Sequence, residues 1–178
     1  MRRVPFLAAV TAAVLLIGCS DGGTGLGAVA IGGPKRYPMG DKVEVGHVTY
    51  RVLETQWMTQ IPQDPTPRIP QNRFLLVRVS AANGGATDAS LPGFTLQADD
   101  GKTYTELSAG EGVPQWIGML RKVKPADSLQ GNVVFDAPPQ HYSLRVTDEN
   151  SDTAALIDLP LNLNPEAPPQ IPIPEARK

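Results

Sequence analysis

The sequence contains very little cysteine, very little histidine and no excess of positive charge, and each shortage excludes a class of function. Cys19 is the only cysteine among 178 residues, so the chain can form no internal disulfide. The two histidines, His47 and His141, lack neighbours with the spacing of zinc or copper ligands, which usually number three or four. A formal net charge of −2 does not attract phosphate backbones. We therefore expect no cofactor, no metal site and no nucleic-acid partner.

The sequence also lacks the short motifs of common enzymes. No segment has the GxxxxGK[ST] pattern that holds nucleotide phosphates. Glu106 stands two residues before Ser108, where a nucleophile elbow has glycine. Residues 148–152 begin like a calcium loop, but Thr153 and Leu159 occupy the positions of its glycine and its bidentate acid. We predict that the protein is not an enzyme.

The N-terminus has the organisation of a bacterial lipoprotein signal. Two arginines precede an apolar run over residues 4–17, which as a helix would be roughly 21 Å long, too short for the ~30 Å hydrocarbon core of a bilayer. Gly18-Cys19-Ser20 follows and resembles the lipobox, which implies cleavage before Cys19 and acylation of its sulfur. A plain secretory signal with an unrelated cysteine and an uncleaved membrane anchor stay open as alternatives. Because Ser20 rather than aspartate follows the cysteine, we expect the outer membrane if the host has two membranes.

Composition divides the chain into four parts. Residues 1–18 are the predicted signal peptide, residues 19–36 a flexible glycine-rich tether, residues 37–160 the folded domain and residues 161–178 a proline-rich extended tail. Loss of residues 1–18 from the 178 removes two arginines and no acid, which takes the formal charge from −2 to −4 and leaves 160 residues. We expect the mature chain to be exported and held at the membrane by its N-terminal lipid.

Within the predicted domain, apolar and polar residues alternate with a period of two, which is typical of strands with one buried face. The alternation predicts strands around residues 43–45, 48–57, 74–82, 94–97, 129–135, 142–146 and 154–159. Asp99-Asp100-Gly101-Lys102 supplies an Asp-Gly turn, after which Tyr104 begins a return strand. Seven to nine short strands at this spacing predict an all-β fold, an antiparallel immunoglobulin-like β-sandwich, with a small barrel as the alternative.

Several short segments occur in an order that resembles a known family. They are Lys42-Val43-Glu44-Val45, Asn83, Phe94-Thr95-Leu96 with Asp100-Gly101-Lys102-Thr103-Tyr104, and Gln130-Gly131-Asn132-Val133-Val134-Phe135-Asp136-Ala137-Pro138. Together they resemble the bacterial extracytoplasmic family called domain of unknown function 4352 (DUF4352). The resemblance implies an immunoglobulin-like sandwich, often on lipoproteins or secreted proteins, and no established activity. Pro125-Ala126 departs from the family's Pro-Gly, and since alanine is strained at positive φ we expect a different turn there.

Two segments carry apolar residues suited to binding. Residues 58–71 hold four prolines, with Ile61 and Ile69 among them and Trp57 just before, and proline lowers the cost of ordering such a loop. Residues 113–123 place Trp116 near further apolar and basic residues, and Trp, Met and Arg are enriched in protein interfaces. The candidate binding residues are Trp57, Ile61, Ile69 and Trp116. The alternative interpretation assigns Trp116 and Leu120 to the core and lets the prolines protect a sheet edge.

Together these patterns predict a lipid-anchored protein of the cell envelope whose sandwich binds an unidentified envelope or extracellular protein and catalyses nothing. The first alternative is a small-ligand or metal-binding lipoprotein, which would have a pocket lined by Trp57, Trp116 or the histidines. The second is an envelope enzyme whose site is assembled from distant strands.

Acylation should depend on Cys19 alone, because the chain has no other thiol. We expect Cys19→Ala to abolish incorporation of a radioactive fatty acid and to block processing of the precursor, as measured by label and by mobility on a gel. A variant that still takes up label would contradict the lipobox interpretation.

Overall fold

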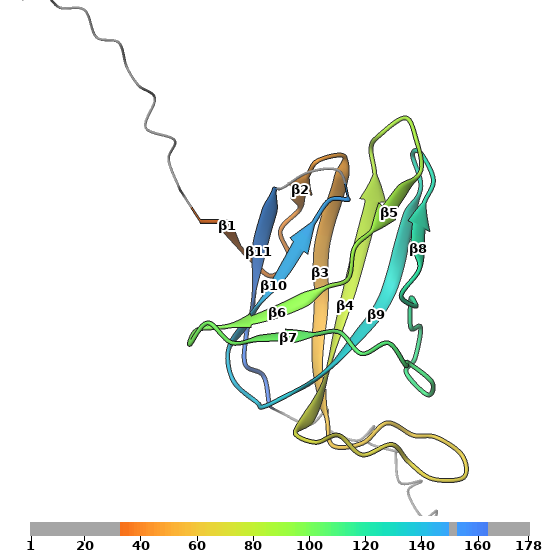
Figure 1. Ribbon diagram of the computed structural model, residues 1–178, viewed down its shortest axis with the longest axis vertical. Coiled ribbons are helices and arrows are strands. Elements are labelled where there is room, and N and C mark those ends of the chain that lie inside the picture. Colours follow the sequence, from red (N-terminus) through yellow and green to blue (C-terminus); the bar gives the residue numbers. More distant parts are fainter. Residues whose placement is uncertain (1–32, 150–152, 164–178) are drawn as a thin grey trace, which may run out of the picture. The chain divides into compact units, whose positions relative to one another are not determined.

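The computed structural model describes residues 33–149 and 153–163, which form strands, turns and loops (Figure 1). Cys19, the predicted signal peptide and most of the predicted tether and tail lie outside the described residues. Within the described part, no helix is long and apolar enough to cross a bilayer.

The described residues form eleven strands. In chain order these are β1 (Lys35–Pro38), β2 (Val43–Val45), β3 (Val48–Met58), β4 (Arg73–Asn83), β5 (Ala89–Leu91), β6 (Thr95–Ala98), β7 (Thr103–Thr105), β8 (Arg121–Val123), β9 (Ser128–Ala137), β10 (Tyr142–Thr147) and β11 (Ala154–Leu159). The seven strands expected from the alternation are present, and so is the return strand expected after the Asp-Gly turn. The three additional strands, β1, β5 and β8, have three or four residues each, which is too short to show a period of two.

The strands pair into two main sheets and one ribbon. The order of the five-stranded sheet is β1-β11-β10-β6-β7, that of the four-stranded sheet is β2-β3-β4-β9, and β5 pairs with β8. Every named pairing in the described part is antiparallel except that of β1 with β11, which is parallel. This confirms the predicted all-β immunoglobulin-like sandwich, with more strands than the seven to nine expected. The fold begins at Lys35, two residues before the expected boundary.

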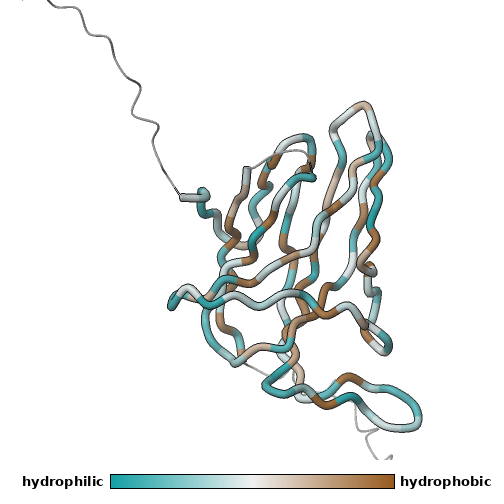
Figure 2. The backbone as a smooth tube through the Cα atoms, viewed as in Figure 1, coloured by the Kyte–Doolittle hydropathy of each residue, from teal (hydrophilic) through white to brown (hydrophobic). Residues whose placement is uncertain are grey.

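The main core lies between the two sheets. Figure 2 shows hydrophobic residues alternating with hydrophilic ones along the strands. The inward side chains are fully buried, among them Val77 and Phe135 from one sheet and Leu144 and Ile157 from the other. Each such side chain contributes about 1.5–3 kcal/mol through burial, so packing alone accounts for a stable domain without a disulfide.

A β-bulge in β3 changes which side chains face the core. The pairing of β3 with β4 shifts register between Val52 and Glu54, so Leu53 adds one residue to the strand. A bulge of this kind reverses the inward and outward phase of the residues that follow. Trp57 therefore faces the main core, and Met58 packs on the opposite side of the sheet.

The two ends of the sandwich differ in what they carry. At the tether end, where the chain enters the described part, Lys35 pairs with Ala155, and Val146 pairs with the same residue from the other side. At the opposite end, the loop end, Leu159 pairs with Tyr142, whose ring contacts Trp57. The proline loop, defined here as residues 59–72 between β3 and β4, extends from the loop end (Figure 1).

The turn before β9 differs from the expectation. Ala126 has a φ of 57°, and the Asp127 N–H donates to the Lys124 carbonyl over 3.1 Å. Proline followed by a residue at positive φ is typical of a type II turn, so the expected change of turn type is wrong. Alanine adopts this conformation because two hydrogen bonds hold the turn against β4: Ala126 N–H donates to the Asn83 carbonyl, and Asn83 N–H donates to the Asp127 carbonyl.

Ala126→Gly should stabilise the domain. The left-handed conformation costs alanine about 1–2 kcal/mol, while glycine adds about 0.4–1 kcal/mol of unfolded-state entropy, so we expect a net gain of roughly 0.5–1 kcal/mol in chemical denaturation. The matched control is Ala86→Gly, at an exposed position without positive φ, which should give a small loss. Equal effects of the two substitutions would contradict the assignment of strain to Ala126.

Candidate functional site

Trp57 belongs to the main core. It lies near the end of β3, half-buried, with its ring centroid 6.3 Å from that of Tyr142. The Tyr142 ring also meets Tyr104 edge-on at 5.6 Å, and burial raises the pKa of Tyr142 to about 12. Its hydroxyl donates to the Pro138 carbonyl over 2.7 Å. The bulge in β3 thus places Trp57 on the inner side of the four-stranded sheet, whereas Ile61 and Trp116 lie on its outer side.

A second, smaller hydrophobic cluster covers part of the outer face of β4 and β9. Its buried members are Ile61, Phe74, Leu76, Val113 and Val134, and Met58, Leu107 and Trp116 pack at its margin. Ile61 has no exposed surface. The expectation that Ile61 is available to a partner is therefore wrong, because the outward side chains of β4 and β9 require an apolar cover and Ile61 provides it.

Trp116 is half-buried and fixed by two glycines. A Cβ on Gly110 would lie 2.0 Å from the Trp116 ring, and a Cβ on Gly131 would lie 2.2 Å from the Gln115 carbonyl oxygen. The segment around Trp116 pairs with the edge of β9, since Asn132 N–H donates to Gln115 and Ile117 N–H donates to Asn132, over 2.9 and 3.2 Å. Trp116 and Ile61 therefore belong to one cluster, which covers the outer face of β4 and β9, and part of the Trp116 side chain remains accessible.

The proline loop is held in place by hydrogen bonds at both ends. Ile61 and Arg68 exchange two backbone hydrogen bonds of 3.0 and 2.9 Å. The Arg68 guanidinium donates to the Ala109 carbonyl over 2.6 Å and lies 5.3 Å from the Phe74 ring centroid. The backbone N–H groups of residues 71 and 72 donate to the Asp136 carboxylate. The loop is thus ordered before any partner binds.

Three large apolar side chains of these two segments remain exposed. Ile69 in the proline loop is 66% exposed, and Met119 and Leu120, just before β8, are 37% and 100% exposed. Ile69 was among the candidate residues, and Leu120 was the residue that the alternative interpretation placed in the core. The exposure of Leu120 contradicts that placement, because only β8 and not the preceding bend enters the sandwich.

Sequence reasoning missed a buried ion pair beside these segments. The Arg121 guanidinium donates to the Glu106 carboxylate, both side chains being almost fully buried. Glu106 also accepts the Phe94 N–H over 2.9 Å, and Arg121 lies 5.0 Å from the Phe94 ring centroid. Tyr50 meets the same ring edge-on, and burial, followed by the nearby Asp148 charge, raises the Tyr50 pKa. The sequence gives no sign that Arg121 is buried, because it stands beside Lys122 and Lys124, which are exposed.

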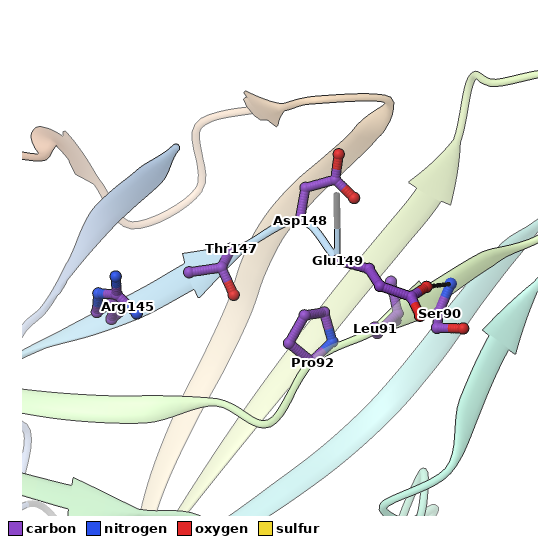
Figure 3. A pocket seen from close by; sticks show the side chains of 7 residues that line it. All are labelled: Ser90, Leu91, Pro92, Arg145, Thr147, Asp148 and Glu149. Carbon is purple, nitrogen blue, oxygen red and sulfur yellow. Dashed lines mark hydrogen bonds between the residues drawn. The ribbon is translucent and has the colours of Figure 1, made fainter. Parts of the chain in front are cut away.

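Shallow hollows occur elsewhere on the surface of the described part. One of them has a volume of about 480 Å³. In Figure 3, Arg145 lies at one end of this hollow and Asp148 and Glu149 at the other, with their carboxylates pointing away from Arg145. Glu149 accepts the Ser90 N–H over 3.2 Å. A second hollow of about 620 Å³ shares Arg145. Neither tryptophan and neither histidine lines these two hollows or the two others found on the four-stranded sheet.

The two histidines lie apart from the candidate segments. His141 Nδ1 is 3.1 Å from the Asp99 carboxylate, in a partly exposed pair. His47 is an exposed residue of the β2–β3 turn, where its carbonyl accepts the Gly84 N–H. Among the described residues, no three side chains of His, Cys, Asp or Glu converge as metal ligands would.

Comparison with known proteins identifies one family and several crystal structures of similar fold. The family described as "Domain of unknown function (DUF4352)" matches residues 37–155. No curated protein matches the sequence.

Three crystal structures are similar in fold. The yjhA protein of Bacillus subtilis is 19% identical, with a TM-score of 0.55 over 70% of this chain and 99% of that one. The ycdA protein of the same species, described as a candidate lipoprotein, is 16% identical, with a TM-score of 0.53 over 67% of this chain and 38% of that one. The secreted protein MPT63 of Mycobacterium tuberculosis is 15% identical, with a TM-score of 0.50 over 71% and 98% of the two chains.

The different burial of Ile61 and Ile69 predicts that their truncation affects the stability of the domain very differently. Ile61→Ala should lower the free energy of unfolding by about 2–5 kcal/mol, because it opens a cavity under the proline loop. Ile69→Ala should change it by less than about 0.5 kcal/mol, because that side chain is in solvent. Thermal and urea denaturation of the two variants measure both effects. Equal stability of the two variants would contradict the burial described here.

Proposed function

Since this chain belongs to the DUF4352 family over residues 37–155, a family without an assigned activity, we propose that it is a lipid-anchored, non-catalytic module of the cell envelope that binds another protein. Residue Cys19 carries the lipid in this proposal. The partner is an envelope or extracellular protein, and its binding surface includes Ile69 and Leu120.

The location rests on the N-terminal pattern and on similar proteins. The arginines, the short apolar run and Gly18-Cys19 have the order of a lipoprotein signal. Two proteins of the same fold are described as a candidate lipoprotein and as a secreted protein, which is in accord with export of this chain. Two or three acyl chains on Cys19 would hold the protein at a membrane with negligible dissociation, at ~0.8 kcal/mol for each buried methylene.

The observation that carries the binding function is the exposure of Ile69 and Leu120 on ordered backbone. Both neighbouring segments are fixed, the first by Arg68 and the second by pairing with β9. A partner would therefore bury apolar surface there without paying the entropy of ordering a loop. The burial of Ile61 serves the fold, whereas Ile69 and Leu120 bury little surface within the fold and keep their apolar side chains available to a partner.

The non-catalytic part of the proposal is supported by how the ionisable side chains are used. Glu106 and Arg121 form an ion pair that is buried away from solvent. The Asp136 carboxylate accepts hydrogen bonds from backbone N–H groups of the proline loop. Both carboxylates therefore serve the fold. The small-ligand alternative requires a pocket at the tryptophans or histidines, and the four hollows described above are lined by other residues.

Photo-crosslinking in the native envelope tests the proposed surface. A photoreactive residue at Ile69 or Leu120 should capture the same protein, identified by mass spectrometry, in higher yield than one at exposed Asp41 in the turn between β1 and β2. Leu120→Ala should leave the melting temperature nearly unchanged and weaken capture about 30-fold, as truncation of a central interface residue does. Equal yields at all three positions would refute this binding surface.

A further inference from the structure

The buried guanidinium of Arg121 has more hydrogen-bond donors than strong acceptors around it. An arginine side chain carries five N–H groups. Arg121 Nε donates to the Gly118 carbonyl, and Nη2 donates to the Glu106 carboxylate. Nη1 is buried, and no atom of the described residues accepts a hydrogen bond from it. Because a buried donor without a partner costs free energy, a further acceptor at this guanidinium would stabilise the fold.

Met119 places its sulfur at the edge of this guanidinium. The sulfur lies 4.0 Å from Arg121 Nη2, and a thioether is only a weak acceptor. The Arg121 side chain has no exposed surface, whereas Met119, in the segment that leads into β8 (Figure 1), is 37% exposed. The methionine side chain therefore contacts solvent on one side and a buried cation on the other.

The guanidinium is fixed, whereas the methionine is adaptable. Arg121 lies 5.0 Å from the Phe94 ring centroid and is paired with Glu106. The same carboxylate accepts the Phe94 N–H over 2.9 Å, which ties the ion pair to the backbone. Methionine has three rotatable bonds and follows irregular surfaces. An acceptor carried by Met119 can therefore adjust to the guanidinium, which need not move.

Oxidation would turn the Met119 sulfur into such an acceptor. The oxidant is a peroxide: the sulfur lone pair attacks one peroxide oxygen, the S–O bond forms as the O–O bond breaks, and the hydroxide that leaves takes the remaining proton and becomes water. The sulfur loses two electrons and the peroxide gains them. The product, methionine sulfoxide, is polar, and its oxygen accepts hydrogen bonds.

We propose that Met119 is an oxidation site whose sulfoxide oxygen accepts a hydrogen bond from the Arg121 guanidinium. Methionine oxidation ordinarily disrupts the packing around the side chain. Met39 and Met58 pack against the two hydrophobic clusters, where an added oxygen would do so. At Met119 the oxygen meets a donor group that lacks strong acceptors, so oxidation stabilises the folded domain.

Oxidation also changes the surface to which the binding function was assigned. Met119 directly precedes Leu120, which is fully exposed, and a sulfoxide replaces apolar surface beside it with a polar group. This consequence rests on the proposed function, both for the partner and for the envelope location, where peroxides from outside the cell reach the domain. Oxidation of Met119 thus lowers the affinity of the surface for an apolar partner while the fold stays intact.

Controlled oxidation of the purified full-length protein tests the contact. Hydrogen peroxide is added, and peptide mass mapping measures the oxidised fraction of each methionine. Met119→Leu is the matched control, since any effect of peroxide there belongs to the other methionines. Relative to this control, oxidation should raise the melting temperature by about 2–4 °C, the shift that one hydrogen bond gives in a domain of this size.

Reversal identifies the product. Methionine sulfoxide reductase with dithiothreitol should return the melting temperature to its starting value. A melting temperature that falls or stays the same when Met119 is oxidised would overturn the proposal. Met119 that stays reduced while the half-buried Met39 and Met58 are oxidised would also overturn it.

Variants assign the effect to Arg121. Met119→Gln carries a carboxamide oxygen one bond beyond the position of the sulfur, so it should melt higher than Met119→Leu without any oxidant. Glu106→Leu with Arg121→Leu removes the guanidinium together with its carboxylate and leaves no unpaired charge, so oxidation should give no rise there. Lys122→Gln, which removes an exposed charge from the same strand, should keep the rise. If the pair variant does not fold, equal melting of the Gln and Leu variants at position 119 still refutes the assignment.

Crosslinking separates this inference from the proposed function. With the photoreactive residue at Ile69, oxidation of Met119 should weaken capture of the partner roughly fivefold, which corresponds to about 1 kcal/mol. Equal capture by the reduced and oxidised protein would overturn the regulation and leave the binding function standing. Absence of any captured protein would refute the binding function and its regulation together, whereas the melting experiment alone decides the contact between the sulfoxide and Arg121.

Discussion

Burial of both faces of β4 and β9 is the constraint on which the candidate site depends. Leu75 and Val77 point into the main core, while Phe74 and Leu76 point out of the sandwich and are equally buried. Outward apolar side chains of this size have to be covered, at about 1.5–3 kcal/mol each. The cover comes from the proline loop on one side and from the segment before β8 on the other. Their backbones are therefore fixed by the needs of the sheet, and their remaining apolar side chains are displayed in defined positions.

The sandwich could be predicted from the sequence because its long strands have one clear buried face. The seven strands with alternation are all present, and β7 follows the Asp-Gly turn where it was expected. The three short strands carry no such signal: β1 contains Lys35, Arg36 and a proline, and β8 begins with a buried arginine. Their strand conformation depends on neighbours distant in sequence, β11 and β5.

The candidate residues were harder to predict, for two physical reasons. The bulge at Leu53 reverses the phase of β3, and no local pattern shows whether Trp57 then faces inward. Ile61 lies in a loop without periodicity, so its burial is decided by what it covers. One signal was present: the four consecutive apolar residues from Phe74 to Val77 indicate a strand buried on both faces, and such a strand requires a nearby apolar cover. Binding by Ile69 and acylation of Cys19 remain predictions.

The parallel pairing of β1 with β11 has a mechanical consequence for a protein tethered by its N-terminus. The four residue pairs from Lys35 to Pro38 run from the tether end towards the loop end. In the proposed anchored state, a partner pulling at the loop end would bring tension in at Lys35 and along the strand axis. The ladder hydrogen bonds between β1 and β11 are then stretched together in shear, rather than opened one after another as in a hairpin peeled from its end. A strand of four residues, too short to be recognised in the sequence, would thus be the first element of the domain to bear the load.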